Sequence, residues 1–250
     1  MKRSDVIAYA LTALFSFLVI RDLLWPLSLQ LDTAVPEGFF HGGHVWIFDH
    51  IAQIIYGNRP FSELTSWIGY PSQTVLRPIG IGPALIAALF NGWLGPYAAY
   101  NVTLMICFVL NAVCTMTLFR MLGARSFAAG SAALFATFSP VILGFLASGQ
   151  VAKLQLWTLA LLSCVWVLAL RGQFKAVLFA APETALLAFT SPSLSLWFPF
   201  IAVALCVHQL SLSSLRRKVL TTALTAVCTV LVMWISKQHY TGALSQTIDI

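Results

Sequence analysis

Apolar residues along the chain form long uninterrupted runs, separated by short polar turns and by one long polar stretch after the first run. The runs are roughly 17–23 residues long and do not alternate with polar positions, so they predict membrane-crossing helices rather than strands. The predicted spans are residues 6–28, 97–119, 126–147, 154–170, 176–191, 193–210 and 219–236. The pattern therefore predicts an all-α polytopic membrane bundle of seven transmembrane helices.

Basic residues in the short turns predict the orientation of this bundle. Loops rich in Lys and Arg face the cytoplasm in most multi-span proteins. The basic groups are Lys2 and Arg3; Arg120 and Arg125; Arg171 and Lys175; and Arg216, Arg217 and Lys218. If all of them are cytoplasmic, the N-terminus lies inside, and Arg21, Arg59, Arg77, Lys153 and Lys237 remain at the outer side. We expect a multi-pass protein of the cell (inner) membrane with a cytoplasmic N-terminus.

The same charge pattern decides how the segment 78–93 is read. It is apolar, but a full crossing would place every later basic turn outside. It also opens with Pro78, Gly80, Gly82 and Pro83 and is shorter than the roughly 20 residues that a crossing requires. We therefore predict a re-entrant helix that returns to the outer side.

The first extracytoplasmic loop, residues 29–96, also contains a predicted interfacial helix at 44–57. The spacing of its apolar residues suits a helix lying along the membrane surface. No linker or second soluble domain interrupts the pattern, so residues 1–250 are predicted to form a single membrane domain.

Composition supports this interpretation and excludes two others. Hydrophobic residues make up 59% of the chain and charged residues 9%, with a mean hydropathy of +0.87. A soluble domain has about 25% charged residues. The net charge of +6 does not indicate nucleic-acid binding, because the basic residues stand singly or in small groups between apolar runs. All five cysteines lie inside apolar runs without C-x-x-C spacing, so we expect buried thiols and no disulfide or metal framework.

Several short motifs, in this order, resemble a known family. They are Gly43–Trp46, Tyr70–Pro71, Ala99–Asn101, Arg120–Leu122 and Phe135–Pro140, followed by the stretch from Gln150 to Trp157. Together they are similar to the N-terminal seven-span module of bacterial C-type (GT-C) glycosyltransferase-like membrane proteins. That group includes arabinose- and mannose-transferase-like and YfhO-like proteins. The resemblance covers roughly residues 1–240.

The resemblance implies inverting transfer of a sugar from a polyprenyl-phosphate-linked donor to an acceptor on the extracytoplasmic face. An acid in the first outer loop typically acts as the base, a basic residue typically holds the lipid phosphate, and some members use a divalent metal. Relatives often carry Gly-Asp shortly before the residue that matches Trp46, where this chain has "FFHGGHVW". Relatives also usually continue beyond the point that matches Ile250.

Sugar transfer to a hydroxyl requires a base near the acceptor and positive charge near the leaving phosphate. The first candidate base is Asp32, which follows the first span directly, and the second is Asp49 on the interfacial helix; the alternative for each is a solvated loop acid without a role. The candidate phosphate-binding residues are Arg77, before the re-entrant helix, and Lys153, before the fourth span. The alternative for both is a cation that reaches the membrane surface.

Two further sets of residues carry weaker hypotheses. His41, His44 and His50 are candidate metal ligands together with Asp49, or else interfacial histidines with ordinary hydrogen bonds. Glu183 lies deep within a predicted span, where a carboxylate is a functional candidate, or else a neutral group bonded by Thr184 or a backbone carbonyl.

Three functional hypotheses follow. The first is a lipid-linked-sugar glycosyltransferase, whose partners are membrane lipids and the polyprenyl-phosphate-linked sugar. The second is a catalytically inactive subunit or scaffold with a membrane-protein partner, which the missing Gly-Asp pair favours. The third is a small-molecule or lipid transporter, against which stands the lack of an internal repeat in the sequence.

Overall fold

The computed structural model describes residues 3–25, 39–59, 64–65, 74–75, 81–209 and 215–248. Nearly all of these residues are helical. The helices are α1 (Arg3–Leu24), α2 (Phe39–Ile55), α3 (Ile81–Leu94), α4 (Pro96–Met121), α5 (Ser126–Thr137), α6 (Pro140–Ala147), the 3-10 turn η1 (Val151–Leu154), α7 (Leu156–Leu170), α8 (Lys175–Thr190), α9 (Pro192–Ser195), α10 (Phe198–Gln209) and α11 (Leu215–Ile248). The loop between α2 and α3 holds two short antiparallel strands that the sequence did not predict, β1 (Leu64–Thr65) and β2 (Thr74–Val75).

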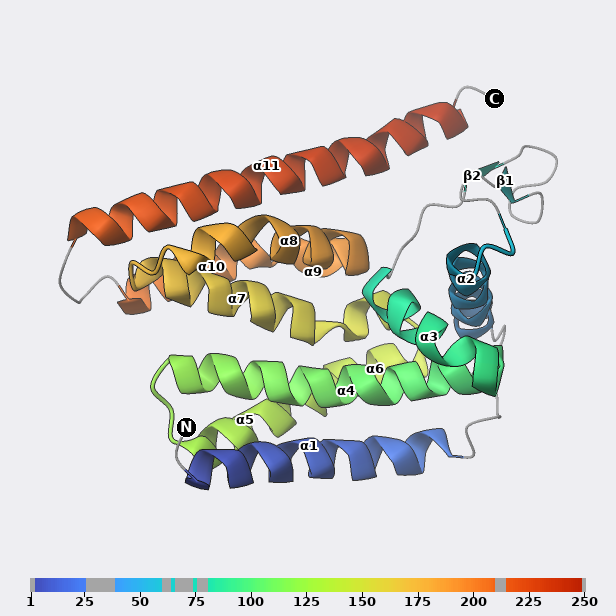
Figure 1. Cartoon of the computed structure of the whole chain (residues 1–250), viewed down its shortest axis with the longest axis horizontal. Coiled ribbons are helices and arrows are strands. Elements are labelled where there is room, and N and C mark those ends of the chain that lie inside the picture. Colours follow the sequence, from blue (N-terminus) through green and yellow to red (C-terminus); the bar gives the residue numbers. More distant parts are fainter. Residues whose placement is uncertain are drawn as a thin grey trace.

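The helices form an elongated bundle through which the chain runs back and forth (Figure 1). Some consecutive helices pack on each other, namely α3 with α4, α4 with α5 and α7 with α8, whereas α11 packs mainly on α8 and α7. For α1 and α4, three side-chain contacts fix the alignment: Tyr9 with Thr117 at 3.1 Å, Ser16 with the Phe108 carbonyl at 3.1 Å, and Asp5 with Arg120 at 3.0 Å. Helix α4 is central, since it packs on α1, α3, α5 and α7.

The start of α1 and the ends of α4 and α7 lie together at one end of the bundle (Figure 1). There, Arg120 donates to the carboxylate of Asp5 at 3.0 Å and to the Ala124 carbonyl at 2.5 Å. Arg171, at the end of α7, donates to the Met121 carbonyl at the end of α4. This end is called the basic end below. Its composition agrees with the grouping of the basic turns that the sequence predicted on one side.

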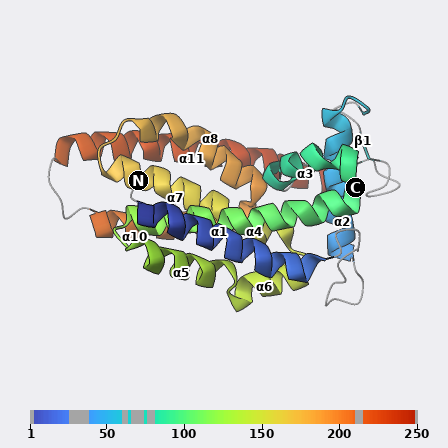
Figure 2. The ribbon, with the colours of Figure 1, turned by 60° about the horizontal axis from the view of Figure 1, so that its bottom comes forward.

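Helices α2 and α3 lie at the opposite end of the bundle. Helix α2 runs across the bundle axis and closes this end, and α3 packs between α2 and the first turns of α4 (Figure 2). Gly95, with a φ of 74°, turns the chain from α3 directly into α4, which begins with Pro96. At 14 residues, α3 is roughly 21 Å long, which is too short to reach the basic end.

Among the described residues, four helical segments are long and apolar enough to cross a membrane: Arg3–Leu24, Pro96–Met121, Ser126–Ala147 and Lys218–Ile235. Many large hydrophobic side chains on the outside of the bundle are exposed, for example Phe15 on α1, Phe200 on α10 and Val230 on α11. An apolar exterior of this kind is compatible with a protein surrounded by lipid.

Two predicted spans are interrupted. The segment predicted as 126–147 consists of α5 and α6, because Pro140 removes a helical hydrogen bond and starts a new helix after Ser139. The segment predicted as 193–210 consists of α9 and α10, with a turn at Leu196 and Trp197. Helix α11 is longer than the predicted span 219–236, since it continues to Ile248.

Candidate functional site

At the end of the bundle that carries α2 and α3, polar side chains contact Asp49. Asp49 lies on α2 and accepts a hydrogen bond on Oδ1 from the side-chain amide of Asn91 on α3, at 2.8 Å. The same oxygen accepts from Gln53, one turn further along α2, at 3.3 Å. Asn91 is buried, whereas Asp49 is half-buried. Two amide donors therefore hold an accessible carboxylate in one orientation at the junction of two helices.

A cationic and an aromatic side chain accompany this acid. His50 is 2% exposed, and its ring stacks on Trp46 at a centroid distance of 5.2 Å. Nη1 of Arg59 lies 3.5 Å from Nδ1 of His50. Arg59 itself is exposed.

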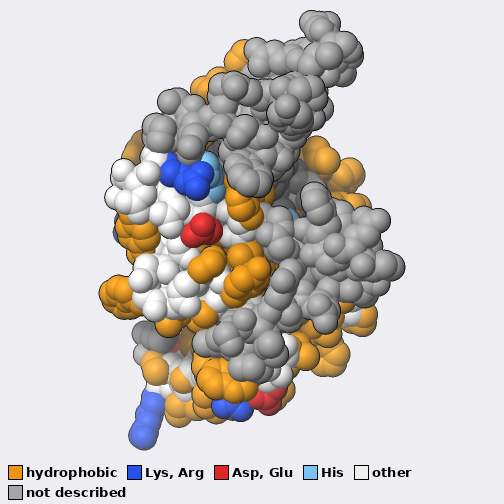
Figure 3. Space-filling model, turned by 90° about the vertical axis from the view of Figure 1, so that its right-hand side faces the viewer, with side chains coloured by type: hydrophobic (Ala, Val, Ile, Leu, Met, Phe, Trp, Pro, Cys, Tyr) orange, Lys and Arg blue, Asp and Glu red, His pale blue; other side chains and the backbone are white. Residues whose placement is uncertain are grey.

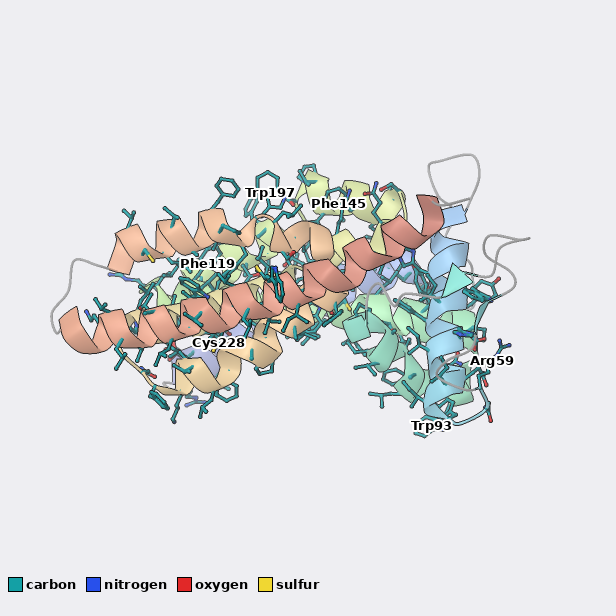
Figure 4. The ribbon with its side chains drawn as sticks, turned by 90° about the horizontal axis from the view of Figure 1, so that it is seen from above. Arg59, Trp93, Phe119, Phe145, Trp197 and Cys228 are labelled. Carbon is teal, nitrogen blue, oxygen red and sulfur yellow. The ribbon has the colours of Figure 1, made fainter. Side chains whose placement is uncertain are left out.

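The figures show how these groups lie on the molecule. Viewed onto this end, acidic, basic and histidine side chains lie near one another among hydrophobic surfaces (Figure 3). Arg59 and Trp93 flank α2 and α3, far along the bundle from Phe119 and Cys228 (Figure 4). We call Asp49, Asn91, His50 and Arg59 the end cluster. It combines a carboxylate, an imidazole and a cation, which are groups that proton transfer and phosphate binding use.

The end cluster contains only part of the site that the sequence predicted. Asp32, Arg77 and the side chain of His41 lie outside the described residues. His44 is described, and its ring meets that of Phe48 edge to face at 6.3 Å. Within the ranges that the structure describes, His, Cys, Asp and Glu form no group of three or more that could hold a metal ion.

Lys153 lies on η1, at a different place from the end cluster. Its ammonium is 5.1 Å from the centre of the Phe145 ring on α6. A cation over an aromatic face is stabilised by the ring quadrupole. The contact therefore gives Lys153 a packing role between η1 and α6, which is an alternative to the predicted phosphate contact.

Glu183 lies on α8 and is half-buried. Its Oε2 atom is buried and has no hydrogen-bond partner among the described residues. The predicted bond from Thr184 is not formed, because the Thr184 hydroxyl donates to the Ala180 carbonyl at 2.6 Å. A buried carboxylate oxygen of this kind is expected to be costly in a membrane span.

The structure also contains a buried polar junction inside the bundle, which the sequence did not identify as a site. Asn111 on α4 donates to the Leu154 carbonyl at 2.7 Å and accepts from the Trp157 backbone N–H at 2.8 Å. It thereby provides hydrogen-bond partners for the backbone groups where η1 ends and α7 begins. The indole of Trp157 donates to Gln155, whose amide donates to the Val151 carbonyl.

The first turn of α3 reaches the same junction. The Gly82 N–H donates to the Thr190 hydroxyl, at the end of α8, at 3.2 Å. Asn111 is 15 residues from the start of α4, roughly 22 Å along the axis of a helix roughly 39 Å long. Interrupted helices at such depth require satisfied backbone groups. We call Gly82, Asn111, Gln155, Trp157 and Thr190 the inner junction and assign it a structural role, the seating of α3 in the bundle.

Parts of both clusters could have been noticed in the sequence. Asn111 and Thr190 are polar residues inside or beside predicted spans, and intramembrane polar groups usually find partners within the bundle. Nothing in the local sequence of Asn91 and Arg59 distinguishes them from the other polar residues of the predicted loop, so the sequence does not identify them as site residues.

Comparison of the chain with protein-family models, with curated proteins and with solved structures finds no match. The function is therefore argued from the geometry of the end cluster and from the membrane character of the bundle.

Proposed function

We propose that the chain is a membrane glycosyltransferase that transfers a sugar from a polyprenyl-phosphate-linked donor at the end of the bundle that carries α2 and α3. In this proposal, α1, α4, α5–α6, α7, α8, α9–α10 and α11 cross the membrane, the basic end faces the cytoplasm, and α3 is re-entrant. The position of α2 across the bundle axis supports this arrangement, because an interfacial helix lies in the membrane plane.

The observation that carries the proposal is the Asp49 carboxylate, held by the amides of Asn91 and Gln53 at the end of the bundle that carries α2 and α3. A base must be oriented toward the acceptor proton, and the amide donors provide that orientation without neutralising the carboxylate. Arg59, an exposed residue beyond the end of α2, is the proposed cation for the leaving phosphate. Asp49 is the proposed base. Arg59 is the proposed phosphate-binding residue, in addition to Arg77.

The test compares Asp49→Asn with Asp22→Asn. Asp22 is an exposed acid at the same end of the bundle that pairs with the neighbouring Arg21, so it is a matched control. We expect Asp49→Asn to lower sugar transfer about 100-fold or more, the range of general base catalysis, and Asp22→Asn to leave it unchanged. The measurement is transfer of radiolabelled sugar in vesicles, with a panel of polyprenyl-phosphate-linked pentose and hexose donors.

Two results would overturn the proposal. Full activity of a double variant, Asp32→Asn with Asp49→Asn, would exclude both acids as bases. No transfer by the unaltered protein from any donor in the panel would exclude the enzyme itself.

A catalytically inactive subunit is the second candidate, and the same contact supports it. Asp49 connects α2 to α3 through Asn91, which is by itself a sufficient structural reason for a carboxylate at this position. In that case the protein retains a membrane-protein partner in constant ratio on purification in mild detergent, and Asp49→Asn changes partner retention rather than sugar transfer.

A further inference from the structure

A groove runs along the outside of the bundle between α1 and α5, near the basic end. Its floor consists of the small residues Ala8, Thr12 and Gly130, and its sides carry larger apolar residues such as Phe15 and Phe127. The hollow has a volume of about 310 Å³. Phe127 is 59% exposed, so the groove opens toward the surroundings of the bundle, where lipid is expected.

The depth of this groove depends on a close approach of the two helices at Gly130. A Cβ atom on Gly130 would lie 2.6 Å from Oγ1 of Thr12, which is closer than packed atoms come. Glycine therefore allows α1 and α5 to touch at the floor while their larger side chains diverge. The groove is thus a feature of the helix packing itself.

A second, polar hollow of about 420 Å³ adjoins the groove at the basic end, and Phe127 lines both. Asp5, Arg120, Arg125 and Ser126 also line this hollow. The charge of Arg120 is offset by Asp5, which it contacts at 3.0 Å. Arg125 is exposed, and in the part of the chain that the structure describes no carboxylate pairs with it. The hollow therefore has a net positive charge.

We propose that this pair of hollows binds one anionic glycerophospholipid, with the phosphate headgroup at Arg125 and an acyl chain in the groove between α1 and α5. The order of the two parts matches the order in a lipid, a charged head at the end of the bundle followed by an apolar chain toward its middle. The positive charge selects an anionic headgroup over a zwitterionic one. Buried methylene groups of the chain add affinity that a soluble anion does not gain.

This inference goes beyond the proposed sugar transfer. The site lies at the basic end of the bundle, away from the end cluster, and uses none of its residues. It requires lipid around the bundle but no catalytic activity, so its test is independent of the enzyme assay.

The headgroup part is tested with Arg125→Gln. The control is Lys175→Gln, an exposed cation of α8 at the same end that does not line either hollow. Each protein is reconstituted in nanodiscs of equal phosphatidylglycerol and phosphatidylcholine, and co-purified lipid is counted by native mass spectrometry. We expect the unaltered protein to retain one phosphatidylglycerol and Arg125→Gln to retain about fivefold less, as expected for one basic residue near an anionic headgroup. Lys175→Gln should retain it fully.

The chain part is tested with Ser131→Trp, which places a large ring in the groove, against Ala132→Trp on the next, exposed position of α5 outside it. We expect Ser131→Trp to lose the retained lipid and Ala132→Trp to keep it, with equal elution of both proteins in size-exclusion chromatography. Each of three results would overturn the proposal. The unaltered protein could retain the two lipids equally, or Arg125→Gln and Ser131→Trp could both retain the lipid unchanged. The third result is a dimer that holds no lipid.

Discussion

At the scale of single residues, close backbone approach at glycine decides how α3 enters the bundle. Gly82 lies in the first turn of α3, against Thr190 and Trp157. A Cβ atom there would be 2.8 Å from Oγ1 of Thr190 and 3.2 Å from the Trp157 ring. Because both neighbours are buried and take part in the inner junction, neither side chain moves without loss of other contacts.

The variant Gly82→Ala is therefore expected to destabilise the protein by about 1–3 kcal/mol, the usual cost of an added methyl group in a packed interior. Gly144→Ala is the matched control, since Gly144 lies in α6 with no atom within 4 Å of the added methyl group. We expect that change to be neutral or to stabilise by up to about 1 kcal/mol, because alanine favours a helix. Thermal unfolding in detergent measures both, and equal melting temperatures would contradict the close packing of α3.

At the scale of elements, α2 and α3 form one unit that is attached to α4 by a sharp turn. The unit is held by Asp49 with Asn91 and by the Tyr56 hydroxyl, which donates to the Ala88 carbonyl. Gly95 joins α3 to α4 along the chain, with φ 74° and ψ 169°, a backbone region that is essentially restricted to glycine. The angle between α3 and α4, and hence the place of Asp49, depends on this residue.

Replacement of Gly95 tests that dependence. Gly95→Val is expected to cost about 1–2 kcal/mol, because a side chain with a positive φ is strained. Gly144→Val should cost less, since Gly144 also has open space around it but does not have a positive φ. Open space surrounds Gly95, so a difference between the two variants reports backbone strain rather than a clash. Limited proteolysis after Arg59 measures release of the unit, and equal cleavage of the two variants would contradict the argument.

At the scale of the whole molecule, each turn between helices lies at one of the two ends of the bundle. These positions connect the fold to its proposed orientation in the membrane. The basic groups of α1, α4 and α7 meet at one end, and α2 and α3 lie at the other. Helix α3 has 14 residues; its first turn contacts the inner junction, and its end turns directly into α4.

Cysteine labelling in intact cells tests this arrangement. Asn58→Cys and Tyr97→Cys flank α3 at exposed positions, and Gln173→Cys lies in the turn before α8 at the basic end. With Cys206 and Cys228 replaced by alanine, we expect a membrane-impermeant maleimide to label positions 58 and 97 but to label 173 only after the cells are opened. Labelling of 58 and 97 from opposite sides would show that α3 crosses.

The sequence by itself determined the helical class, the approximate helix positions and the collection of basic turns at one end. Those features depend on local quantities: the length of an apolar run, the punctuation by Pro and Gly, and the sign of the charges in each turn. The sequence also predicted a short helix at 78–93, and α3 spans Ile81–Leu94.

Tertiary structure decided which side chains meet. Asp49 and Asn91 are 42 positions apart, and Gly82 and Thr190 are 108 apart, so no local pattern connects them. The groove at Gly130 likewise depends on a contact between two helices, α1 and α5. Composition requires an apolar exterior, but hydrogen-bond partners and close contacts are properties of pairs of helices. They arise only when the bundle is packed, because each buried polar group must then find its partner within the protein.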